Sequence, residues 1–274
     1  MAELSKLRYE DFICLEPILS IVEASIWTGR VALEKPVSLL LIAEQESAKT
    51  EALLHFKLTN TLQYISDITS RGIGAYQRDI EQGKLRHFVI LDLVRIVNHP
   101  KGVSDRCIAN LASLMEEGEA DTSDAGGRRS WSDMPKIGCL MSITPKFFAS
   151  RAGNWRKTGF MTRFLPVRFK YTPRTVQRIH KAIANDHKMP PPIALKLPEL
   201  PTAVELPEAA KIMLRDKALR LGQLNNVYGF RYQRSLRRLA KANALMRGSS
   251  LVNEADMCKV LEWADFFTEK EIEL

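Results

Sequence analysis

The stretch from Pro36 to Thr50 reads PVSLLLIAEQESAKT and divides into two parts. Residues 37–43 form a short, almost uninterrupted apolar run, which is typical of a strand buried on both faces of a parallel sheet. Polar residues follow, and residues 50–55 have the pattern of a helix. The stretch therefore predicts a strand that leads through a tight polar turn into a helix.

The last eight residues of this stretch have the spacing of a phosphate-binding loop, G-x-x-x-x-G-K-[ST], with alanine at both glycine positions. They are Ala43, Glu44, Gln45, Glu46, Ser47, Ala48, Lys49 and Thr50. In such a loop the lysine reaches the β- and γ-phosphates, and the Ser or Thr hydroxyl binds Mg²⁺. The alanines lack the backbone freedom of glycine, and the glutamates repel phosphate. The alternative is an ordinary strand, polar turn and helix.

A second acidic position favours the nucleotide interpretation. Residues 87–92 form another buried-type strand that ends in Asp92. The Mg²⁺-organising aspartate of P-loop ATPases also closes such a strand. Leu93 stands where many of these enzymes have a glutamate that activates water. Taken alone, Asp92 would be interpreted as the cap of a turn.

The pattern of strands and helices up to about residue 172 predicts an α/β fold, a parallel sheet with helices on both faces. Further strands are expected at 62–68, 137–144 and 165–171, and helices at 8–27, 77–82 and 104–117, the last capped by Ser104. The polar segment 119–136, which contains Gly126 and Gly127, predicts a hairpin or loop.

After residue 173 the chain changes character. Residues 174–186 have a helical pattern, residues 188–207 are rich in proline and predict an extended connector, and helices are expected at 208–223, 230–247 and 253–268. The predicted organisation is an N-terminal helical segment (1–29), a nucleotide-binding α/β domain (30–173) and a small helical lid (174–274).

Composition narrows the class of partner. The formal net charge of +8 is compatible with a polyanionic partner, most commonly nucleic acid, and equally with a basic solubilising surface. The clustering of basic residues in the sequence favours the polyanion. The four cysteines are far apart, as expected for reduced thiols in the cytoplasm. No apolar run is long enough to span a membrane, and the N-terminus does not have the pattern of a signal peptide, so no membrane partner is expected.

Several short motifs follow one another in an order that resembles the minichromosome-maintenance (MCM) branch of the AAA+ ATPases. The motifs are LMEE at 114–117, AGG at 125–127, SITP at 142–145, the segment 159–167 around Arg163, and the helix 231–244 that begins with Arg231. They resemble, in turn, that branch's Met-Glu helix end, its hairpin, its sensor-1 strand, its arginine-finger segment and its lid helix with the sensor-2 arginine. The resemblance covers residues 30–268.

The resemblance implies ATP and Mg²⁺ as cofactors. Lys49 and Thr50 would hold phosphate and metal, and Asp92 would help to hold the metal. Thr144 would be the polar sensor, where the family has Asn.

The resemblance also implies roles for two arginines. Arg163 would reach into the site of a neighbouring subunit, and Arg231 would touch the γ-phosphate. The alternatives are a surface ion pair for Arg163 and the solvated face of a basic helix for Arg231.

A DNA-contacting hairpin is implied at Arg128, Arg129 and Trp131, because the related helicases place a pore hairpin here. Basic side chains can follow a phosphate backbone and an aromatic ring can stack on a base. The alternative is a charged surface loop with Trp131 packed onto the body.

The resulting expectation is a ring-forming homo-oligomer, with a hexamer as one option, that uses ATP to move along or remodel DNA. The chain would be a minimal core without the N-terminal DNA-binding domain of a full MCM helicase, as would suit a virus, a phage or a mobile element. The alternative is a degenerate AAA+ module that binds DNA or a replication partner without hydrolysis, which the altered loop and Leu93 favour. A weaker third option is a nucleic-acid-binding protein with an accidental loop resemblance.

Overall fold

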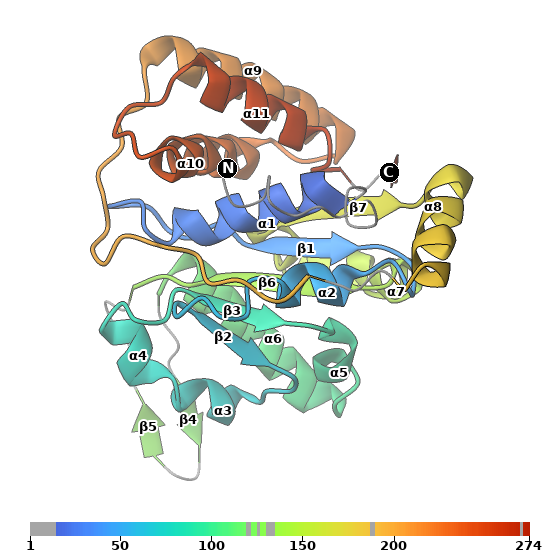
Figure 1. Ribbon diagram of the computed structural model, residues 1–274. Coiled ribbons are helices and arrows are strands. Elements are labelled where there is room, and N and C mark those ends of the chain that lie inside the picture. Colours follow the sequence, from blue (N-terminus) through green and yellow to red (C-terminus); the bar gives the residue numbers. More distant parts are fainter. Residues whose placement is uncertain (1–14, 119–121, 125–126, 130–134, 187–189, 269–270) are drawn as a thin grey trace.

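The computed structural model describes residues 15–118, 122–124, 127–129, 135–186, 190–268 and 271–274 (Figure 1). Its centre is a six-stranded sheet with the order β2-β3-β6-β1-β7-β8, in which every neighbouring pair is parallel. The strands are β1 (Leu39–Ile42), β2 (Leu62–Ile65), β3 (His87–Ile90), β6 (Gly138–Ile143), β7 (Leu165–Lys170) and β8 (Ile272–Glu273). The predicted α/β class with a parallel sheet is confirmed.

Strand β1 lies inside the sheet, and its side chains alternate between two hydrophobic cores. Leu39 and Leu41 face the core that contains α1 (Glu16–Thr28), α2 (Lys49–Leu54) and the C-terminal helices. Leu40 and Ile42 face the core on the other side of the sheet. That core contains α3 (Ser70–Gly74), α4 (Gln77–Glu81), α5 (Leu93–Val97), α6 (Lys101–Glu116) and α7 (Pro145–Lys157). The continuous apolar run is thus explained by burial on both faces.

The C-terminal part folds as the expected helical lid. It consists of α9 (Glu208–Leu224), α10 (Phe230–Met246) and α11 (Glu254–Ala264), which lie close to the predicted ranges. Helix α10 packs against α1, so α1 lies between the lid and the sheet (Figure 1). The short α8 (Pro173–Ala184) follows β7, close to the predicted helix at 174–186.

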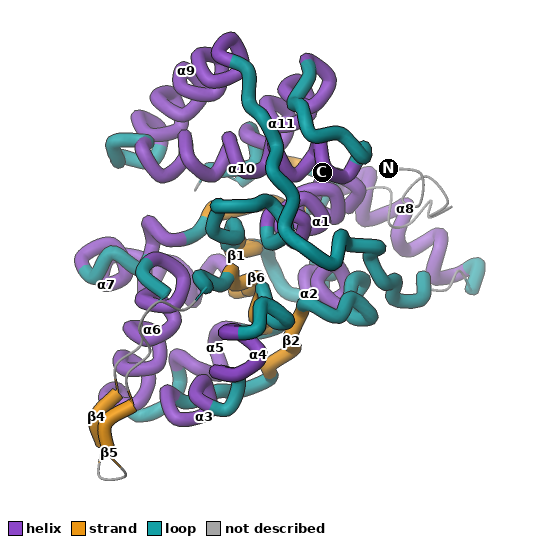
Figure 2. The backbone as a smooth tube through the Cα atoms, turned by 90° about the vertical axis from the view of Figure 1, so that its left-hand side faces the viewer, coloured by secondary structure: helices purple, strands orange, loops and turns teal. Residues whose placement is uncertain are grey.

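The connector before the lid runs as an extended chain over its described residues, 190–207 (Figure 2). It is tied to the body by backbone hydrogen bonds. The Ile193 amide donates to the His55 carbonyl (2.6 Å), and the Thr202 amide donates to the Arg30 carbonyl (2.8 Å).

Helix α6 begins one turn earlier than predicted. Its N-cap is Pro100, whose carbonyl accepts hydrogen bonds from the amides of Val103 and Ser104. Ser104 lies inside the helix and is buried, so the prediction that it caps the helix was wrong. The cause is that Pro100, with its extended backbone, already supplies the turn into the helix.

The hairpin predicted in segment 119–136 is confirmed for its described residues. Strands β4 (Thr122–Asp124) and β5 (Gly127–Arg129) pair antiparallel and extend away from the main sheet (Figure 1). None of the described helices is long and apolar enough to cross a membrane.

His87 at the start of β3 is a buried ionisable group in the sheet. Its side chain is fully buried, and a Cβ added at Gly138 on the adjacent β6 would overlap its ring. Burial, helped by the charge of Arg86, lowers the pKa of His87 to about 3. His87 is therefore neutral in the folded protein over a pH range in which the histidine of the unfolded chain, with its usual pKa of 6.5, becomes protonated.

We expect this histidine to make the protein acid-sensitive. Between about pH 6.5 and the folded pKa of about 3, the unfolded chain binds a proton that the folded chain does not. The free energy of unfolding should then fall with decreasing pH by up to about 1.4 kcal/mol per pH unit from this group. Denaturant unfolding at about pH 7 and about pH 4.5 should show a smaller loss in His87→Gln than in wild type.

His180→Gln is the matched control, because His180 is exposed on α8. It should keep the pH dependence of the wild type. An equal loss of stability in wild type and His87→Gln would contradict the assignment.

Candidate functional site

The carboxyl ends of three strands bring together the predicted phosphate loop, Asp92 and Thr144. Ile42 at the end of β1 pairs with Ile143 at the end of β6. The next residues, Ala43 and Thr144, are therefore neighbours, and the Ala43 amide donates to the Ile143 carbonyl (3.4 Å). Thr144 is partly buried at the start of α7.

Two side-chain hydrogen bonds link the segments that meet at the carboxyl ends of the strands. The Ser142 hydroxyl donates to the carbonyl of Leu91 (2.5 Å), which places the residue before Asp92 beside β6. The Tyr171 hydroxyl, just beyond β7, donates to the Ser47 carbonyl inside the loop (3.0 Å). The loop is thus fixed from both sides.

The loop keeps a conformation that normally calls for glycine. Glu46 has φ 60° and Ala48 has φ 55°, both in the left-handed region. This conformation costs a residue other than glycine roughly 1–2 kcal/mol. At the two glycine positions of the motif, Ala48 has this strained conformation, whereas Ala43 does not have a positive φ. The turn therefore retains its shape at the expense of local strain.

Lys49 is folded back into the loop. Its Nζ donates to the Glu44 carbonyl (2.6 Å) and to the Ser47 hydroxyl (3.3 Å). Burial lowers the pKa of Lys49, and the carboxylates of Glu44, Asp92 and Glu51 oppose that shift. The Glu44 carbonyl and the Ser47 hydroxyl accept from Nζ where phosphate oxygens could accept instead.

Backbone donors are also free at the end of the loop. In the described part of the chain, the amides of Ala48, Lys49 and Thr50 donate to no other group, as expected at the start of a helix. Free amides beside a lysine are suited to bind phosphate oxygens.

Asp92 and Thr50 could serve Mg²⁺. Asp92 is exposed and caps α5 by accepting a hydrogen bond from the Val94 amide (3.0 Å), so the capping interpretation is confirmed and one carboxylate oxygen remains available. The described residues contain no cluster of three His, Cys, Asp or Glu side chains suited to a metal. Mg²⁺ commonly uses one or two protein oxygens together with phosphates and water, so the two residues fit this ion. Leu93 is fully buried and offers no base.

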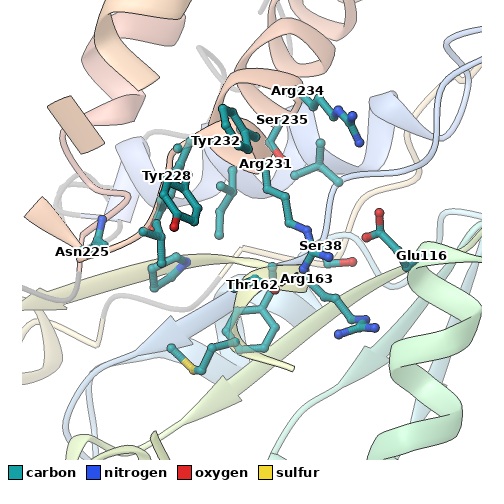
Figure 3. Close-up of a pocket in the computed structure, with 18 of the residues that line it drawn as sticks. Ser38, Glu116, Thr162, Arg163, Asn225, Tyr228, Arg231, Tyr232, Arg234 and Ser235 are labelled. Atoms are coloured by element: carbon teal, nitrogen blue, oxygen red, sulfur yellow. Dashed lines mark hydrogen bonds between the residues drawn. The ribbon is translucent and has the colours of Figure 1, made fainter. Parts of the chain in front are cut away.

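The two predicted arginines lie together, but at the opposite edge of the sheet. Arg163 ends the short 3₁₀ helix Met161–Arg163, directly before β7, and Arg231 lies in the first turn of α10. Both line a cavity of about 500 Å³ between the lid and the amino ends of β1 and β7 (Figure 3). The five residue steps of β7 separate the two edges by roughly 17 Å. Lys49 and Arg231 of one subunit therefore do not share a cleft.

Hydrogen bonds hold both arginines in place. Arg163 donates from Nε to the Ala112 carbonyl (3.1 Å) and from Nη1 to the Gly159 carbonyl (2.7 Å). Arg231 donates to the Thr162 hydroxyl.

One carboxylate accompanies the arginines. Glu116 ends α6 and forms an ion pair with Lys35. Burial raises the pKa of Glu116, but the cations Lys35, Arg231 and Arg163 together outweigh burial and lower it. Glu116 therefore stays ionised near neutral pH.

Sequence analysis missed other residues of this cavity. Lys35, Tyr228 and Phe230 line it, and no motif or spacing marked them. Arg128 and Arg129 lie on β5, away from both edges, and Trp131 lies outside the described residues.

Comparison with known proteins supports the fold. No family model matches the sequence, and no curated protein matches it. Among solved structures, the chain is similar to a full-length MCM homologue from Methanopyrus kandleri, with a TM-score of 0.57 and 17% sequence identity. The match covers 97% of this chain and 60% of that chain, so this chain spans less than two thirds of that protein. The likeness and the parallel sheet show that this chain shares the α/β fold of that part of the MCM homologue.

We expect glycine at position 48 to relieve the strain in the loop. Ala48→Gly should stabilise the protein by about 0.5–1 kcal/mol, because the left-handed cost exceeds the entropy that glycine adds. Ala149→Gly, on an exposed turn of α7, is the matched control and should destabilise by about 1 kcal/mol. Denaturant unfolding of both variants tests the sign, and destabilisation by Ala48→Gly would show that the loop is not strained at this residue.

Proposed function

We propose that this protein is an oligomeric AAA+ ATPase that acts on DNA as a helicase-like or remodelling motor. The observation that carries the proposal is the division of the predicted site between two edges of one sheet. The loop with Lys49 and Asp92 lies at the carboxyl edge, and Arg163 with Arg231 lies at the amino edge. A complete site then requires two subunits, with the amino edge of one facing the loop of the next.

Each half of this composite site has its own chemical task. Lys49, the free loop amides and Thr50 would bind the phosphates, and Asp92 would orient the metal. Mg²⁺, when bound, would neutralise phosphate charge. Arg163 and Arg231 of the neighbouring subunit would stabilise the charge that develops on the transferred phosphoryl group. An arginine supplied in this way can raise the rate by about 10³–10⁵.

A binding module without hydrolysis is the second candidate. The strain at Glu46 and Ala48 favours it, and so does the buried Leu93 in place of a water-activating glutamate. Calorimetry with ATP and Mg²⁺, combined with a phosphate-release assay, separates the candidates. Tight binding without turnover would select the module.

Substitutions at the two edges should complement each other. Lys49→Ala should lose ATP binding, and Arg163→Ala should bind ATP but lose at least about 10³-fold in hydrolysis. Mixing the two variants should restore part of the activity, because some interfaces then pair an intact loop with an intact arginine. Lys57→Ala, at an exposed lysine after α2, is the control and should behave as wild type.

A mixture no more active than the sum of its components would contradict a shared site. Unchanged ATP binding in Lys49→Ala would contradict the assignment of the loop.

The β4–β5 hairpin is the proposed DNA contact. If Arg128 and Arg129 both neutralise phosphates, Arg128→Ala/Arg129→Ala should weaken DNA binding and reduce the slope of log K against log salt concentration by about 1.4–1.8. Lys146→Ala/Lys157→Ala, on exposed positions of α7, removes the same charge and should leave the slope nearly unchanged. Fluorescence anisotropy over a salt series measures both. Equal losses in the two double variants would indicate a non-specific charge effect.

A further inference from the structure

The cavity at the amino edge carries much more positive than negative charge. Six cations line it, Lys35, Arg156, Arg163, Arg231, Arg234 and Arg238, against the single carboxylate of Glu116. Lys35 is paired with Glu116, Arg238 with Glu34, and Arg163 with Glu117 at 4.0 Å. Arg234 is exposed and has no partner among the residues that the structure describes, and Figure 3 shows it beside Ser235, on the same helix as Arg231. The cavity is thus built to receive negative charge.

Its rim is also apolar. Tyr228 and Phe230 stack on each other, with ring centroids 5.7 Å apart, and are 84% and 66% exposed. Exposed aromatic rings beside arginines are typical of the central residues of protein interfaces. A small anion would leave these rings in water, whereas a protein segment would cover them.

The opposite edge offers a segment with the complementary charge. Glu44, Gln45 and Glu46 are consecutive and exposed at the tip of the phosphate loop. Neither glutamate side chain has a hydrogen bond or ion pair within the described structure. The hydrogen bond from Tyr171 to the Ser47 carbonyl, together with the left-handed backbone at Glu46, holds this tip in one shape.

The positions of the two patches determine how copies can meet. They lie at opposite ends of the same parallel strands, so one copy can offer its acidic tip to the basic cavity of the next. A two-fold contact through either edge would instead place like charges against each other. Head-to-tail association satisfies both patches.

We propose that the basic cavity of one subunit receives the acidic tip 44–46 of a second copy, so that the subunits associate without nucleotide. Glu44 and Glu46 then face Arg231 and Arg234 and supply the negative charge that phosphate would otherwise bring to this interface. The inference rests on the head-to-tail arrangement of the proposed function. It adds a specific pair of surfaces and removes the need for ATP in assembly.

Charge reversal tests this pairing. Sedimentation velocity of the full chain, freed of nucleotide by apyrase and EDTA, should show association that weakens between about 0.05 M and about 0.5 M salt. Glu46→Arg and Arg234→Glu should each weaken association at least about tenfold. An equimolar mixture of the two variants should associate, because each provides the intact edge that the other lacks. Glu81→Arg on α4 and Arg220→Glu on α9 are exposed, charge-matched controls and should behave as wild type.

Three results of the sedimentation experiment would overturn the inference. They are association that appears only with ATP, charge reversals that have no effect, and a mixture that fails to associate. If Arg234→Glu lost assembly only because it no longer binds DNA, the inference would also be wrong. Anisotropy with a single-stranded oligonucleotide measures DNA binding by this variant. ATP binding by the Arg234→Glu variant, measured by calorimetry, separates this inference from the proposed function. If the subunits associate only with ATP, and ATP binding depends on Lys49, the nucleotide-free pairing is wrong while the proposed function stands.

Discussion

The burial of β1 on both faces is the constraint on which the rest of the structure depends. Its four residues are fully buried, two in each core, so the strand cannot leave the sheet without exposing leucine and isoleucine side chains to water. Its carboxyl end fixes where the loop begins, and the segment before its amino end forms one wall of the arginine-lined cavity. The distance between the loop and the arginines within one chain is therefore set by strand length.

This constraint also explains how the loop can keep an unfavourable backbone. Residues in the left-handed region persist only where their surroundings hold them there. Here β1 holds one end of the loop, α2 holds the other, and Tyr171 fixes the middle through the Ser47 carbonyl. The strain at Glu46 and Ala48 is small beside the apolar burial of the strand. Loss of glycine therefore does not entail loss of loop shape.

The sequence predicted β1, β3 and β6 well because each is a nearly continuous apolar run with a clear end. Pro145, for example, marks the end of β6 within two residues. Strand β8 was missed because two residues in an acidic tail carry no such pattern. The start of α6 was wrong because Ser104 was chosen as a favoured N-cap residue, whereas the carbonyl of Pro100 already begins the helix. The loop, Asp92 and Thr144 could be grouped because the ends of parallel strands meet at one edge. The cavity could not be foreseen, because Lys35 and Tyr228 meet only once the lid packs against α1.

The two glutamates of the loop acquire a role in the proposed assembly. In an isolated subunit they repel phosphate, and Glu44 and Asp92 surround the single charge of Lys49. A cavity with six cations from a neighbour would cancel that repulsion. Nucleotide affinity and subunit affinity would then be linked, and by thermodynamic reciprocity each must change the other by the same factor. The sign depends on geometry. If the arginines of the cavity can contact phosphate and the loop glutamates at the same time, nucleotide strengthens the assembly. If phosphate and glutamate compete for the same arginines, nucleotide weakens it.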